Sequence, residues 1–94
     1  MTNRLADKIT IITGATSGIG EATARRYIEE GATVVLAGRS QEKGEALAKE
    51  LGERAVFKCT DVMKEEDIAA LVDFTVEKYG RLDSLFNNAG AGDR

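Results

Sequence analysis

The sequence contains no histidine and no proline, and it has a single cysteine, Cys59. One cysteine cannot form an internal disulfide, and one cysteine without histidine offers too few ligands for a structural zinc site. We therefore expect no metal site, and a reducing cytoplasm is the simplest setting for the chain. The absence of proline is typical of regular elements joined by short connections.

Long apolar segments are also missing. No apolar run approaches the roughly 20 residues of a membrane-spanning helix, and the first residues, MTNRLADK, lack the apolar centre of a signal peptide. The formal net charge of -3 argues against nucleic acid as a partner. With 94 residues, of which 43% are hydrophobic and 31% charged, the chain predicts one small folded domain over residues 1–94.

Short apolar runs alternate with helical patterns along the chain. The runs predict strands at 9–13, 33–37, 55–59 and 83–87. Between them, apolar residues recur at the spacing of one helix face, and a glycine ends each helical stretch, at Gly31, Gly52 and Gly80. Strands joined through helices run parallel with right-handed crossovers, so the order β-α-β-α-β-α-β predicts an α/β fold.

Three of the ten glycines fall in the segment TGATSGIG, which follows the first predicted strand and opens the first predicted helix. A helix N-terminus binds anions, phosphate above all, and glycine lets a ligand approach the backbone. Thr16 and Ser17 add hydroxyls that could donate to phosphate or cap the helix. The spacing departs from G-x-G-x-x-G, and no Lys-Ser/Thr follows, so a triphosphate-binding P-loop is not supported. Alternatively, these glycines only form a tight turn.

Three motifs together resemble the short-chain dehydrogenases/reductases: TGATSGIG, then Asp61-Val62 after the third strand, and NNAG (87–90) after the fourth. The resemblance runs from about residue 6 to residue 90. It implies a Rossmann-type doubly wound parallel sheet with strand order 3-2-1-4 and an NAD(P)-dependent oxidoreductase that moves hydride between a nicotinamide cofactor and an alcohol or carbonyl.

The resemblance also assigns roles to individual residues. It implies that Thr13 ties the first strand to Asn87 on the fourth. The other implied positions would contact the cofactor: Gly14, Ser17, Gly18, Ile19 and Gly20 at the pyrophosphate and adjacent ribose, Asp61 and Val62 at the adenine, and Asn88, Ala89 and Gly90 beneath the adenosine half and its ribose. Thr16, between them in the loop, is added for its hydroxyl. Simpler explanations stay open: Asp61 as a helix N-cap only, the two asparagines as turn residues, and Ile19 as an ordinary core side chain.

The end of the second strand bears on the choice of cofactor. NAD-binding Rossmann proteins usually place an acid there to hold the ribose 2′-hydroxyl, but here Gly38 takes that position and Arg39 follows. A guanidinium suits a phosphate, and Ser40 can add a hydroxyl, so we expect NADP to be preferred and NAD to be possible. Alternatively, Arg39 stacks on the adenine or extends into water.

The family's catalytic pair, Tyr-x-x-x-Lys, is not found in the 94 residues. Tyr27 is followed four places on by Gly31, and Tyr79 by Asp83, so we assign no catalytic residue and cannot read the substrate. We expect the cofactor-binding half of an oxidoreductase, truncated before the catalytic half. The alternatives are a non-catalytic nucleotide-binding module and an inactive truncation. We also expect the fourth strand to mediate self-association or pairing with a complementary chain.

Overall fold

The computed structural model describes residues 6–88 and shows strands and helices in strict alternation. The elements are β1 (Ile9–Thr13), α1 (Gly18–Glu29), β2 (Thr33–Gly38), α2 (Gln41–Leu51), β3 (Ala55–Cys59), α3 (Glu65–Tyr79) and β4 (Ser84–Asn87). The predicted element order is confirmed. The strand bounds differ from the prediction only at one end of β2 and one end of β4, where each moves by one residue.

The four strands form one parallel sheet in the order β3-β2-β1-β4, as predicted. At the centre of the sheet, Ile11 of β1 is in register with Val35 of β2 and with Leu85 of β4. The chain moves outward from β1 to β2 and β3, and then crosses back to place β4 on the other side of β1. The order therefore reverses between β1 and β4, and ligands of open α/β sheets bind at the carboxyl ends of the strands at such a point.

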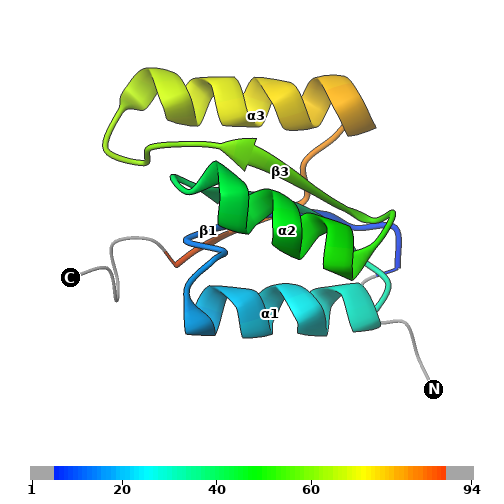
Figure 1. Cartoon of the computed structure of the whole chain (residues 1–94). Helices are drawn as coiled ribbons and strands as arrows, with labels where there is room; N and C mark the ends of the chain where they lie inside the picture. Colours follow the sequence, from blue (N-terminus) through cyan, green and yellow to red (C-terminus); the bar gives the residue numbers. More distant parts are fainter. Residues whose placement is uncertain (1–5, 89–94) are drawn as a thin grey trace.

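Helices cover both faces of the sheet, with α3 on one side and α1 and α2 on the other (Figure 1). Successive residues of a strand point to opposite faces, so neighbouring residues of β1 belong to different cores. Ile12 packs in the cluster that includes Ala24 of α1 and Leu47 of α2, whereas Ile11 packs with Leu71 of α3. All five residues of β1 are buried, which explains why this strand contains no charged residue.

Capping residues define most of the helix ends. Ser17 and Ser40 are the N-caps of α1 and α2, and each side chain accepts a backbone hydrogen bond from its helix. Gly80, with a φ of 84°, is the C-cap of α3 in the left-handed conformation that favours glycine. Lys64 is the N-cap of α3 and makes no side-chain capping bond. The acidic residues of the first turn of α3 instead complement the helix dipole.

Two further features bear on function. Within residues 6–88, no helix is long and apolar enough to cross a lipid bilayer. Over the same range, no group of three or more histidine, cysteine, aspartate and glutamate side chains is placed to hold a metal ion.

Candidate functional site

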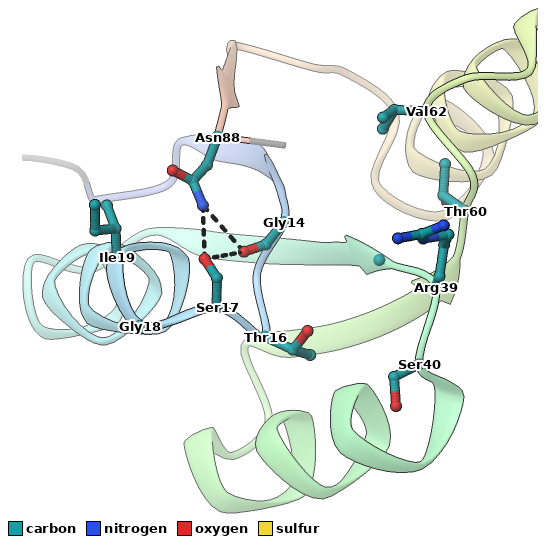
Figure 2. Close-up of a pocket in the computed structure, with 11 residues that line it drawn as sticks. Gly14, Thr16, Ser17, Gly18, Ile19, Arg39, Ser40, Thr60, Val62 and Asn88 are labelled. Atoms are coloured by element: carbon teal, nitrogen blue, oxygen red, sulfur yellow. Dashed lines mark hydrogen bonds between the residues drawn. The ribbon is translucent and has the colours of Figure 1, made fainter. Parts of the chain in front are cut away.

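A cleft of about 450 Å³ opens where the loop after β1 meets the carboxyl ends of the other strands. Figure 2 shows Ser17, Ile19 and Asn88 toward one end of this cleft and Arg39, Thr60 and Val62 toward the other. Its lining consists of Gly14, Thr16, Ser17, Gly18, Ile19, Gly38, Arg39, Ser40, Thr60, Val62 and Asn88. The cleft thus brings together most of the residues that the sequence assigned to the cofactor, from the ends of all four strands and the segments that follow them.

The turn between β1 and α1 is closed by hydrogen bonds to one carbonyl. Gly14 has a φ of 62°, a conformation that favours glycine. Its carbonyl oxygen accepts bonds from the backbone N–H of Ser17 (3.1 Å) and from the Ser17 hydroxyl (2.9 Å). Ser17 Oγ in turn accepts from the Gly20 amide at 3.3 Å. This leaves the first turn of α1 at the cleft, where helix amides favour an anion.

Gly20 and Gly18 lie two residues apart and have different roles. Gly20 is buried and is absent from the cleft lining. A Cβ atom there would overlap the Gly14 carbonyl oxygen and lie 2.8 Å from the Gly14 carbonyl carbon. A Cβ atom at Gly18 would meet no protein atom within 4 Å. Gly20 therefore allows α1 to pack against the turn, while Gly18 keeps the cleft accessible.

Two asparagines join the glycine turn to the end of β4. Thr13 Oγ1 donates to Asn87 Oδ1 at 2.7 Å, which is the link between the first and fourth strands that the family resemblance implied. Asn88 Nδ2 donates to the Gly14 carbonyl (3.2 Å) and to Ser17 Oγ (2.8 Å), as the dashed lines in Figure 2 show. The strand reversal between β1 and β4 is therefore bridged by side chains. Ala89 and Gly90 lie outside the described residues.

Among the described residues, Arg39 is the only charged one that lines the cleft, and it lies at the other end. No acidic residue within 6–88 lines the cleft, and the guanidinium forms no ion pair with any acid in that range. Ser40, beside it, uses its hydroxyl to accept from the Lys43 amide at 3.3 Å. This end of the cleft therefore has a net positive charge from its lining residues.

The loop between β3 and α3 contributes Thr60 and Val62 to the lining. Thr60 is not among the residues predicted from the sequence, although its place just before Asp61-Val62 is a usable signal. Its amide donates to the Gly38 carbonyl at 2.7 Å, which extends the β2–β3 pairing and brings this loop to the cleft. Thr60 is almost fully buried, and its hydroxyl donates to the Lys58 carbonyl.

Asp61 does not line the cleft. It is half-buried, its Oδ1 accepts from the Met63 amide at 3.0 Å, and its own amide donates to Asp67 Oδ2 at 2.9 Å. The alternative that Asp61 is a helix N-cap is wrong, because Lys64 occupies that position. The alternative that Ile19 is a core residue is also wrong, since Ile19 is 67% exposed at the cleft.

The lining combines hydroxyls, helix N-terminal amides, one guanidinium and two apolar side chains. Such groups can bind a phosphate and pack against a flat ring. Within residues 6–88, no lining residue is a histidine, tyrosine, lysine or carboxylate, which are the usual proton-transfer groups of enzymes.

Comparison with known proteins agrees with this geometry. Residues 8–94 match the model of the short chain dehydrogenase family. Tropinone reductase-like 1 from Erythroxylum coca is 54% identical over 87 residues, which cover 93% of this chain and 32% of that protein. L-fucose dehydrogenase from Oryctolagus cuniculus is 43% identical over 88 residues, covering 94% of this chain and 31% of that protein. The chain thus spans about a third of the length of these relatives.

A solved structure shows the same fold. The 3-ketoacyl-(acyl-carrier-protein) reductase from Brucella melitensis, determined in complex with NADH, has a TM-score of 0.83 and 40% sequence identity. The similarity covers 86% of this chain and 33% of the reductase chain. Fold, glycine turn and family match agree: the chain belongs to the short-chain dehydrogenase family.

Proposed function

We propose that the cleft binds a nicotinamide dinucleotide and that this chain supplies the cofactor-binding half of an oxidoreductase acting on an alcohol or carbonyl. The observation that carries the proposal is the Gly14–Ser17 turn at the N-terminus of α1, held to β4 by Asn88. This turn presents helix amides at the switch point of a parallel sheet, where a pyrophosphate binds in Rossmann folds. The NADH complex of the related Brucella reductase supports the same class of ligand.

We further propose that NADP is preferred over NAD. Gly38 leaves the end of β2 without the carboxylate that would hold a ribose 2′-hydroxyl and repel a 2′-phosphate. Arg39, exposed and unpaired with any acid in the described part of the chain, supplies a guanidinium at the same place. A charge-assisted contact of this kind contributes about 1.5–3 kcal/mol.

Calorimetric titration of the chain with NADPH, NADH and ATP tests both proposals. Arg39→Ala is expected to weaken NADPH binding at least tenfold and to leave NADH binding nearly unchanged. Arg54→Ala is the matched control, because Arg54 is an exposed arginine that donates to the Ile28 carbonyl and does not line the cleft. An equal loss of affinity for both cofactors in Arg39→Ala would show that Arg39 does not read the 2′-phosphate. Binding of ATP alone would favour a nucleotide-binding module without oxidoreductase function.

The catalytic step requires groups that these 94 residues lack. The family's Tyr-x-x-x-Lys pair is absent from these 94 residues, and the part of the cleft lining that the structure describes holds no group suited to proton transfer. We therefore propose that the purified chain has no dehydrogenase turnover of its own. NADPH-dependent reduction of any compound in a carbonyl panel, by protein free of contaminating enzymes, would refute this. The free, exposed Cys59 fits a reducing cytoplasm as the setting.

We also propose that β4 is a site of self-association or of pairing with a complementary chain. Among the described residues, β4 pairs only with β1, and Leu85 is 51% exposed. An unpaired strand edge with apolar side chains recruits another strand. Sedimentation velocity at low micromolar concentration should show species larger than a monomer. A sharply melting monomer that binds no hydrophobic dye would contradict the proposal.

A further inference from the structure

We propose that Gly44 and Phe57 are positioning residues for the 2′-phosphate end of the cleft, because their contact sets how closely the first turn of α2 approaches the sheet. The inference rests on the proposed function, since neither residue lines the cleft itself. It concerns the preference between NADPH and NADH rather than dinucleotide binding as such.

The contact between Gly44 and Phe57 leaves no room for a side chain at position 44 of α2. Gly44 of this helix is buried, and the Phe57 ring occupies the space where a Cβ atom of residue 44 would lie. A Cβ atom at Gly44 would overlap the ring and would lie only 2.6 Å from Phe57 Cγ. A glycine inside a helix destabilises the helix relative to alanine. The close approach of the Phe57 ring explains why glycine occupies this helical position.

The same ring extends toward the cleft. Phe57 lies on β3 in register with Leu36 of β2, and it packs against the core shared by α1 and α2. Its Cε1 atom lies 4.0 Å from the position of a Cβ atom built on Gly38, and Thr16 Oγ1 lies 3.9 Å from that position. Gly38 and Thr16 both line the cleft. The Phe57 ring therefore fills the space between α2 and the end of β2 directly beneath the binding site.

The first turn of α2 connects Gly44 to the residues that would contact a 2′-phosphate. The distance between α2 and the sheet at Gly44 therefore sets the position of these residues. The Gly44 amide donates to the Ser40 carbonyl at 2.9 Å, and the Ser40 hydroxyl caps the helix through the Lys43 amide. A displacement of α2 at Gly44 therefore moves Ser40 and the adjoining Arg39 with it. Ordinary carbon contacts are about 3.5–4.0 Å, so an added methyl group requires the helix and the ring to separate by more than ~1 Å. Charge-assisted hydrogen bonds of about 2.7–2.9 Å do not survive such a shift.

The test compares the ratio of NADPH to NADH affinity in four forms of the chain by calorimetry. Gly44→Ala is expected to lower this ratio about tenfold, approaching the effect of Arg39→Ala. Phe57→Leu replaces the ring between α2 and the end of β2 by a smaller side chain. It should lower the ratio of NADPH to NADH affinity at least threefold. The double variant Gly44→Ala/Phe57→Leu should return to within threefold of the wild-type ratio, because the methyl group then occupies space that the ring has vacated. Such non-additivity is the signature of direct coupling.

Ala46→Gly is the matched control, since it changes helix propensity at an exposed position of the same helix. It should leave the ratio unchanged. If Gly44→Ala does not fold, Phe57→Leu and the double variant decide the question. An unchanged ratio in the folded variants, or an equal loss of affinity for both cofactors, would overturn the inference while leaving the proposed function intact. A wild-type chain that binds neither NADPH nor NADH would overturn the proposed function instead.

Discussion

Replacing Gly20 by alanine should destabilise the fold, whereas the same change at Gly18 should not. The added methyl group at Gly20 overlaps the Gly14 carbonyl oxygen and lies 2.9 Å from Ala15 Cα, so only a backbone shift can accommodate it. The Gly14 carbonyl cannot move freely, because Ser17 and Asn88 both donate hydrogen bonds to it. Overpacking of this kind costs about 3 kcal/mol, and the better helix propensity of alanine returns about 1 kcal/mol.

The expected net loss is about 2 kcal/mol, which lowers Tm by roughly 8–16 °C in a domain of this size. Thermal unfolding followed by circular dichroism measures it. Gly18→Ala is the matched control and should melt close to the wild type, because its Cβ meets no protein atom within 4 Å. Gly18→Val should likewise stay folded but lose dinucleotide binding, since its side chain would enter the cleft.

Two results would refute this reasoning. A Gly20→Ala variant that melts within 2 °C of the wild type would show that α1 does not depend on close contact with the Gly14 carbonyl. A folded Gly18→Val variant with unchanged affinity for NADPH and NADH would remove the glycine turn from the binding site. Gly14→Val is expected to lose binding as well, because its φ of 62° disfavours a branched side chain at the turn.

Three further predictions concern stability. Lys64→Ser should raise the free energy of unfolding by about 1 kcal/mol in urea denaturation, because it supplies the side-chain cap that α3 lacks. An unchanged free energy of unfolding would mean that the acidic first turn already stabilises the N-terminus of α3. Thr13→Val should cost about 1–2 kcal/mol in the same assay, since Asn87 Oδ1 loses its 2.7 Å donor, and a neutral result would show that water replaces the bond. The Arg81 guanidinium, and then the Ile9 amide, hold the pKa of Asp83 below its ordinary value, so its stabilising effect should be complete above about pH 4 and lost as pH falls through the lowered pKa. Asp83→Asn should flatten the acid limb of the stability curve, and an unaltered limb would assign acid sensitivity to other carboxylates.

The sequence alone determined the order and type of the elements. β1 could be predicted because both its faces are buried, which removes charged residues from the run ITIIT. The helices could be predicted because their buried positions recur at helical spacing, and Gly80 ends α3 through its own backbone conformation. The proposed anion site was predicted from an equally local property, the N-terminal amides of a helix that starts just after a glycine turn. Each of these signals depends only on residues close together in the chain.

Tertiary structure decided which of the candidate residues reach the cleft. Gly18 and Gly20 look equivalent in the sequence, but the packing of α1 on the Gly14 carbonyl separates a lining residue from a buried one. Thr60 joins the cleft through a hydrogen bond to Gly38, whose strand lies beside β3 only in the folded sheet. The contact of Gly44 with Phe57 likewise joins residues 13 apart on different elements. These outcomes depend on distances between segments, and such distances are fixed only when the sheet and its helices pack together.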